Sequence, residues 1–199
     1  MVIGREASAS EEFLLDDVPG TSGRLDVGLR CVRAAMLLSH GLRRDVVVDL
    51  VLGGGPRAPR VLRIRGADVK FLRPDERNLA VLAKKVLASH ADDDRPGYVE
   101  VKPGIAVARG GLGVVLGDLG GATPYVLEEE GTDVRQVSDL AAGDTVFFLG
   151  DPDGFDPASR ASLEAIGARP IRVGPVSLHA EDVVVLVNNE LDRRRLEPR

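Results

Sequence analysis

The chain alternates short apolar segments with segments of helical periodicity from end to end, and this alternation constrains its fold more than any other feature. Apolar or β-branched runs between turn residues predict strands at residues 2–4, 46–52, 61–65, 105–108, 124–127, 146–149 and 171–173. Helical spacing or helix-start residues predict helices at about 25–39, 74–87, 112–119, 157–166 and 180–193. The loop GGGPRAP makes 46–52 and 61–65 a hairpin. Alternating strands and helices indicate an α/β fold with a mostly parallel sheet flanked by helices.

The last predicted helix comes from a segment with two interpretations. Residues 183–187 are rich in Val and alone favour a strand. A helical period nevertheless extends through Ala180, Val183, Val184, Val187 and Leu191. Because a period over about fifteen residues outweighs local propensity, we expect a helix from about 180 to 193.

Size and composition indicate one globular domain, residues 1–199, with an aliphatic core. Hydrophobic residues make up 44% of the chain and charged residues 29%, but aromatic residues only 4%, with no Trp. The single cysteine, Cys31, is expected in the core; it excludes an intramolecular disulfide and points to a reducing compartment. With neither a secretory signal pattern nor an apolar run of about 20 residues, we expect a cytoplasmic protein without a membrane span.

Charge is distributed unevenly along the chain. The formal net charge is −5, yet residues 24–44 and residues 57–77 each carry +4 and the remainder carries −13. Two basic segments on an acidic body are compatible with a localised phosphate-binding face. A general use of arginine, 22 Arg against 4 Lys, explains the same pattern without a nucleic acid.

Two predicted strands end in glycine, within FFLGDPDGF (147–155) and IRVGPVSLH (171–179). In α/β sheets, ligands bind beyond the carboxyl ends of strands, where loops expose backbone groups. Gly150 and Gly174 would let a ligand approach the backbone closely. Two ordinary strand-to-loop turns are the alternative.

Four ordered motifs identify the chain more closely. FLGDPDGF and RVGPVSLHAEDVVVLVNNELD, with GRLDVGLRCVRAAMLLSHGLRRDVVVDLVL (23–52) and LRPDERNLAVLAKKVL (72–87), resemble the tRNA (pseudouridine-54-N1)-methyltransferases. That family belongs to the SPOUT class of S-adenosylmethionine-dependent enzymes. The resemblance covers most of the chain and is looser in the first residues and over residues 90–145.

The resemblance implies a fold, a cofactor and an assembly. It implies that a C-terminal part, about residues 145–193, forms a deep trefoil knot, a rare exception to the rule against knots. It also implies S-adenosyl-L-methionine as cofactor and a homodimer in which the helix from about 180 packs against the second subunit. The implied backbone contacts to the cofactor come from Leu149, Gly150, Val173, Gly174, Pro175, Ser177 and Leu178.

The implied reaction is N1-methylation of pseudouridine at position 54 in the T arm of tRNA, an in-line attack of a ring nitrogen on a sulfonium methyl. The protein must position the reactants and provide a proton acceptor or stabilise the base anion. Asp26 is the candidate proton acceptor and Arg24 the catalytic residue beside it. Candidate substrate contacts are Arg73, Asp75, Arg77 and His179. Local structural roles are the alternative to these substrate contacts. Asp26 and Asp75 suit the first turn of a helix, and His179 suits a local hydrogen bond at the start of the next helix.

Other substrates and another class of protein stay open. The acidic total charge leaves free pseudouridine, another small heterocycle or rRNA as alternatives. A non-catalytic S-adenosylmethionine-binding module is the alternative from a different class. We expect no metal: GDPDGFDP lacks the closing glutamate of an Asp-rich calcium loop, and His90 with residues 92–94 favours a solvated loop.

Overall fold

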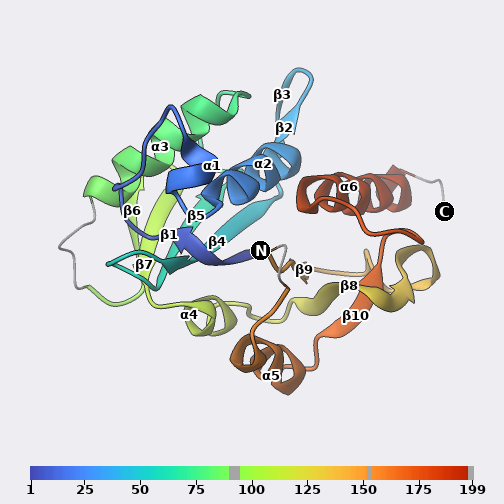
Figure 1. The fold of residues 1–199 in the computed structure, drawn as a ribbon. Helices are drawn as coiled ribbons and strands as arrows, with labels where there is room; N and C mark the ends of the chain where they lie inside the picture. Colours follow the sequence, from blue (N-terminus) through green and yellow to red (C-terminus); the bar gives the residue numbers. More distant parts are fainter. Residues whose placement is uncertain (90–94, 152–153, 197–199) are drawn as a thin grey trace.

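Residues 1–89, 95–151 and 154–196, which the computed structural model describes, contain two main sheets (Figure 1). The larger sheet has the strand order β1 (Val2–Ser8), β4 (Val47–Gly54), β5 (Arg60–Arg65), β7 (Ile105–Arg109) and β6 (Tyr98–Lys102). The smaller sheet has the order β10 (Arg169–Arg172), β8 (Thr123–Asp133) and β9 (Thr145–Phe148). The predicted loop at His90 and residues 92–94 lies outside the described residues.

The first residues of β1 join the two sheets. The Ile3 N–H donates to the Leu149 carbonyl at 2.9 Å, and the Leu149 N–H donates to the Met1 carbonyl at 3.0 Å. On its other edge, β1 pairs in parallel with β4, and the smaller sheet is parallel throughout. Strands from β10 through β8, β9 and β1 to β4 therefore run parallel, and the end of β9 lies at the centre of the molecule.

The prediction of a mostly parallel sheet is wrong, because the sheet is mixed. The pairs β4–β5, β5–β7 and β6–β7 are all antiparallel. The predicted hairpin of β4 and β5 is confirmed and begins this antiparallel half, since a short loop can join only antiparallel neighbours. The observed architecture is an α/β fold with helices packed on mixed sheets.

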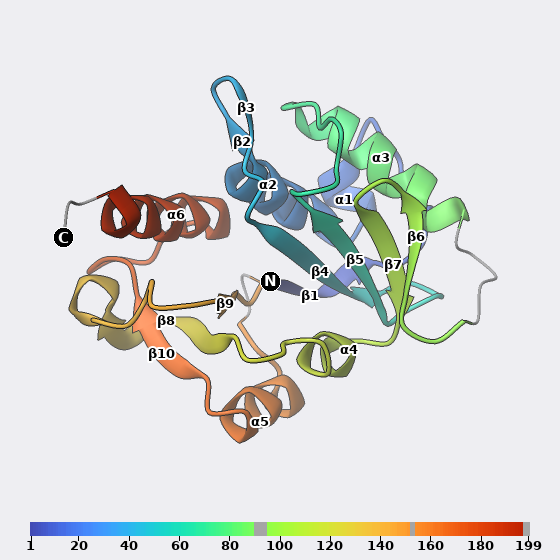
Figure 2. The ribbon, with the colours of Figure 1, turned by 180° about the vertical axis from the view of Figure 1, so that it is seen from behind.

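Helices flank the sheets: α1 (Val18–Thr21), α2 (Leu25–Met36), α3 (Glu76–Ser89), α4 (Leu112–Leu116), α5 (Pro157–Ala165) and α6 (Ala180–Leu196). Helices α2 and α3 lie over one face of the larger sheet, and α6 lies beside α2 over the smaller sheet (Figures 1 and 2). Arg43 joins the two halves through two bonds to Asp192 of α6, at 2.7 and 2.5 Å. The helical interpretation of the last segment is confirmed.

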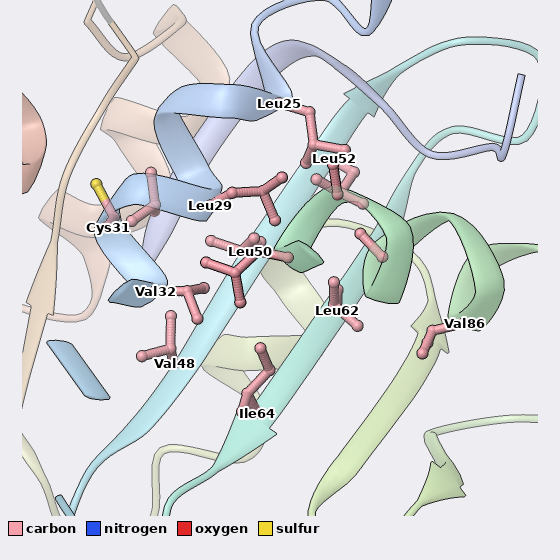
Figure 3. Packing of buried hydrophobic residues seen from close by; sticks show 14 of the residues in the cluster. Leu25, Leu29, Cys31, Val32, Val48, Leu50, Leu52, Leu62, Ile64 and Val86 are labelled. Atoms are coloured by element: carbon pink, nitrogen blue, oxygen red, sulfur yellow. The ribbon is translucent and has the colours of Figure 1, made fainter. Parts of the chain in front are cut away.

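The largest core lies between α2, α3 and the larger sheet (Figure 3). Leu29 of α2 packs with Leu50 of β4 and Leu62 of β5, and each is at most 2% exposed. Burial of each such side chain stabilises the fold by roughly 1.5–3 kcal/mol. Cys31 is buried as predicted, and burial raises the pKa of its thiol to about 12. A thiol in this state is a packing residue rather than a nucleophile.

Several local elements differ from the sequence predictions. Helix α2 ends at Met36 because the chain turns there into a short hairpin, β2 (Leu37–Leu38) and β3 (Gly41–Leu42). Strand β6 was not predicted, and β8 continues six residues beyond the predicted end at Leu127 to a short 3-10 helix, η1 (Val134–Gln136). No helix among the described residues is long and apolar enough to cross a membrane.

Candidate active site

A cleft of about 1000 Å³ lies where the two halves of the molecule meet. Its walls come from the start of α2, the middle of β8, the ends of β9 and β10, and the first turn of α6. In Figure 2, β8, β9, β10 and α6 lie together in the left part of the view, and α2 lies beside α6. The cleft is therefore at the carboxyl ends of parallel strands, where α/β folds bind ligands.

The two glycine-ended strands meet at this cleft. Six of the seven predicted cofactor contacts line it: Leu149, Gly150, Val173, Gly174, Ser177 and Leu178. Pro175 is not among the described residues that line it, whereas His179 is. A Cβ on Gly174 would meet no protein atom within 4 Å, so the backbone there faces open space. The sequence thus located one wall of the cleft correctly, although the ligand contacts themselves stay a prediction.

A second wall was not predicted and comes from a bulge in β8. Strand β10 pairs with β8 at Tyr125 and Val126 and then only from Thr132 onwards, so the residues between leave the ladder. Leu127 and the three glutamates at 128–130 line the cleft from this bulge. Glycine is required behind it, because a Cβ on Gly131 would lie 2.4 Å from the Ile171 backbone nitrogen. The sequence signal was the run EEEG inside a strand pattern, since an isolated strand glycine suggests a bulge.

Arg24 occupies an unusual backbone conformation at the edge of the cleft. Its φ of 66° is the single positive φ of a non-glycine residue among the described residues. Such a conformation costs of order 1–3 kcal/mol and persists where the surroundings fix it, most often at functional sites. Its side chain is 55% exposed and lines the cleft.

Asp26 anchors this arginine from beneath. The Arg24 guanidinium donates to its carboxylate at 3.1 and 3.3 Å, and Arg30 donates at 2.7 Å. Asp26 is 1% exposed and is not among the described residues that line the cleft. Burial opposes its ionisation, but the two arginines outweigh burial and hold its pKa below the usual value. Asp26 is therefore a fixed, buried anion. Its carboxylate is poorly placed to receive a proton from a ligand.

Arg30 connects the two halves of the site and was missed by sequence reasoning. It bonds Asp26, reaches Glu76 at 3.3 Å, and donates to Glu181 of α6 at 2.7 Å. Burial opposes ionisation of Glu181, but backbone and Arg30 hydrogen bonds prevail and lower its pKa. Nothing local in the sequence links Arg30 to a residue 151 positions away.

A second, smaller cavity of about 210 Å³ adjoins the cleft. Backbone and aliphatic side chains of β1, α2 and β4 form most of its walls, and Glu6 lies on its exposed rim. Arg24, Val27 and Asp151 line both this cavity and the cleft. These three residues therefore lie between the two spaces.

The remaining predicted substrate contacts are not among the described residues that line the cleft. Arg77 pairs with Asp16 at 2.7 Å, and Asp75 accepts a bond from the Asn78 backbone N–H at 2.9 Å. The bond from Asn78 gives Asp75 the helix-start role that was the alternative to substrate contact. The same bond lowers the pKa of the Asp75 carboxyl. Arg73 is exposed just before α3, outside the described lining of either cavity.

Comparison with known proteins shows the family of this chain. The family model described as putative SAM-dependent RNA methyltransferase matches residues 1–196. The chain belongs to this family. Two relatives are each a tRNA (pseudouridine(54)-N(1))-methyltransferase. The Methanosarcina acetivorans protein is 39% identical over 99% of this chain and 92% of its own. The Halobacterium salinarum protein is 38% identical over 96% and 94%.

A solved structure has a fold similar to that of this chain. Nep1 of Archaeoglobus fulgidus, crystallised with S-adenosylhomocysteine, superposes with a TM-score of 0.64 at 18% identity, covering 88% of this chain and 73% of Nep1. At this identity the likeness concerns the fold alone. It agrees with the α/β architecture of mixed sheets described above.

Proposed function

We propose that this protein transfers the methyl group of S-adenosyl-L-methionine to N1 of pseudouridine 54 in tRNA. The observation that carries this proposal is the identity of 39% over 99% of the chain to a tRNA (pseudouridine(54)-N(1))-methyltransferase. The cleft at the strand ends supports it, because it provides a place for a cofactor beside a strained arginine.

The cofactor fits the cleft on physical grounds. Gly174 offers open backbone, against which a flat ring can lie without side-chain hindrance. The glutamates of the β8 bulge provide negative charge for a ligand that carries a sulfonium and an ammonium group. Ser177 bonds Glu129, which joins the loop after β10 to this bulge. When bound, S-adenosylmethionine would supply an electrophilic methyl group.

We assign the residues of the cleft as follows. The cofactor is held by backbone groups at Leu149, Gly150, Val173 and Gly174, together with Ser177 and Leu178. Pro175 stiffens the loop after β10 from outside the lining. His179, at the end of that loop, contacts the substrate. Arg24 binds the target nucleotide with its planar donor fork. Asp26 positions Arg24 rather than acting on the substrate itself, because it is buried beneath the arginine.

The tRNA backbone would bind outside the cleft. Arg77 is 62% exposed and its partner Asp16 is 87% exposed, so their pair contributes little and a phosphate can replace the aspartate. Arg73 lies exposed four residues before Arg77. We propose these two arginines as phosphate contacts, with Asp75 holding the start of α3 between them.

We also propose the knot and the homodimer that the sequence resemblance implies. Strand β10 returns to the edge of β8 opposite β9, and the chain then crosses back to α2. This path supports the proposal of a knotted C-terminal part of about 145–193 within one domain. Apolar side chains exposed on α6 and the preceding loop, Val185, Leu186 and Val176, suit a subunit contact. Light scattering of the purified protein tests the dimer, and a monomeric mass would contradict it. Its cytoplasmic location stays a prediction from the single cysteine.

Label transfer from methyl-labelled S-adenosylmethionine tests the proposed reaction. The substrates are a tRNA transcript with pseudouridine at position 54, the same transcript with uridine, and free pseudouridine. We expect label only in the first. Transfer to the free nucleoside alone would assign a small-molecule substrate, and cofactor binding without transfer to any of the three would favour a non-catalytic module.

A further inference from the structure

Arg24, Val27 and Asp151 line both cavities, so these three residues lie between the cleft and the smaller cavity. Six of the seven predicted cofactor contacts line the cleft, and Asp151 follows Gly150 directly. If a methyl group leaves a cofactor in the cleft, an acceptor in the smaller cavity receives it at this junction. The groups that surround the reacting atoms are therefore those of the junction.

The smaller cavity suits a single pyrimidine ring. Its volume of about 210 Å³ is many times the roughly 10–15 Å³ that one water molecule needs, so a group larger than water fits there. Its walls are mainly glycine backbone and aliphatic side chains, including Gly4, Gly28 and Leu52. An enzyme that acts on a base in folded RNA must take that base out of its stack into such a pocket.

Asp151 is the carboxylate placed at the junction. Its side chain is 13% exposed, which shields it from bulk solvent. Arg5 fixes one oxygen, Oδ2, through its backbone N–H at 3.0 Å and its Nε at 3.3 Å. Two other carboxylates are less well placed: Asp26 is buried beneath Arg24, and Glu6 lines the smaller cavity but not the cleft.

We propose that the smaller cavity receives the target base and that Asp151 accepts its N1 proton. This inference rests on the proposed methyl transfer. The N1 lone pair would form the N1–CH₃ bond while the S–CH₃ bond breaks. The electron pair of the S–CH₃ bond would stay on sulfur and neutralise the sulfonium. The N1–H proton passes to a carboxylate oxygen of Asp151 and then to solvent, so charge and atoms balance. Arg5 is a positioning residue, and Asp151 is a catalytic residue.

Asp151→Asn tests the proton acceptor, with Asp118→Asn as the matched control. Asp118 is 54% exposed, pairs with Arg63 and lines neither cavity as described. Three quantities are measured for each: the single-turnover rate on pseudouridine-54 tRNA, the affinity for S-adenosylhomocysteine by calorimetry, and the affinity for tRNA. Loss of a general base costs typically 10²–10⁴-fold. We expect Asp151→Asn to lose at least about 100-fold in rate with both affinities kept within about threefold, and the control to retain its rate.

Other outcomes overturn the inference. A rate for Asp151→Asn near that of the unaltered protein removes Asp151 from the chemistry. A slow rate together with weakened cofactor affinity assigns Asp151 to cofactor binding instead. If the unaltered protein methylates none of the pseudouridine substrates, the proposed function fails first, and the two failures are thereby distinguished.

Leu52→Phe tests the base cavity separately. Leu52 is 1% exposed and lines the smaller cavity but not the cleft. A larger ring there reduces the space for a base, so we expect KM for tRNA to rise at least about tenfold, which is about 1.4 kcal/mol, with unchanged cofactor affinity. An unchanged KM in a variant of native melting temperature would overturn the placement of the base.

Discussion

Replacement of Asp26 by Asn separates a positioning role from a catalytic one. The change removes a buried anion that accepts bonds from Arg24 and Arg30, yet keeps its shape. Removal of one partner of a buried ion pair costs about 3–5 kcal/mol. Here the loss is smaller, because Arg24 is 55% exposed and Arg30, 28% exposed, keeps its bond to Glu181. We expect about 2 kcal/mol at neutral pH, which lowers the melting temperature by roughly 4–8 °C in a chain of this size.

The pH dependence of this loss gives an internal check. The pKa of Asp26 is lower in the folded protein than in the unfolded chain. Its ionised form therefore stabilises the fold fully above the unfolded pKa of about 3.9, and this contribution is lost as pH falls through the folded pKa. The difference in unfolding free energy between Asp26→Asn and the unaltered protein should shrink as pH falls below about 4. Denaturant melts at pH 7 and at decreasing pH measure it.

Kinetics of the same variant decide the role. If Asp26 only positions Arg24, the variant keeps cofactor affinity and loses substrate binding, so KM for tRNA rises. A misplaced binding group can cost about 100-fold in kcat/KM. Equal stability of the two proteins at pH 7 would refute the structural reasoning. A large loss of kcat at unchanged KM would instead restore Asp26 as the proton acceptor.

Three further predictions test the cleft, the core and the surface. Gly174→Val points a side chain into open cleft space, so cofactor affinity should fall at least about tenfold while the melting temperature stays within about 2 °C; calorimetry and thermal melts measure both. Leu62→Ala should destabilise the fold by about 2–5 kcal/mol in denaturant melts and leave cofactor affinity intact, because Leu62 is buried outside the lining of both cavities. Arg77→Ala should weaken tRNA binding several-fold at low salt and reduce its salt dependence by about one phosphate contact; equal salt slopes in filter binding would remove Arg77 from the RNA surface.

Local sequence signals predicted most elements of this fold. The α2 and α3 periods, the β4–β5 hairpin and the ambiguous segment of α6 all follow from spacing and turn chemistry over fewer than about twenty residues. The glycine-ended strands β9 and β10 were recognised in the same way, and they do meet at the cleft. The prediction of a mostly parallel sheet was wrong, because strand direction depends on which strands pair. The unpredicted strand β6 adds to the antiparallel half.

The sequence by itself therefore determined most of the elements, the aliphatic core and the two loops that form one wall of the cleft. Only the tertiary structure decided which polar side chains share that cleft. It buried Asp26, left Arg77 outside the described lining of the cleft, and brought Asp151 and the β8 glutamates to the site. Apolar residues recur every three or four positions in a helix and every second position in a half-buried strand. These periods are therefore visible in a short window of sequence. The bond between Arg30 and Glu181 spans 151 positions, and only the packing of α6 against α2 creates it.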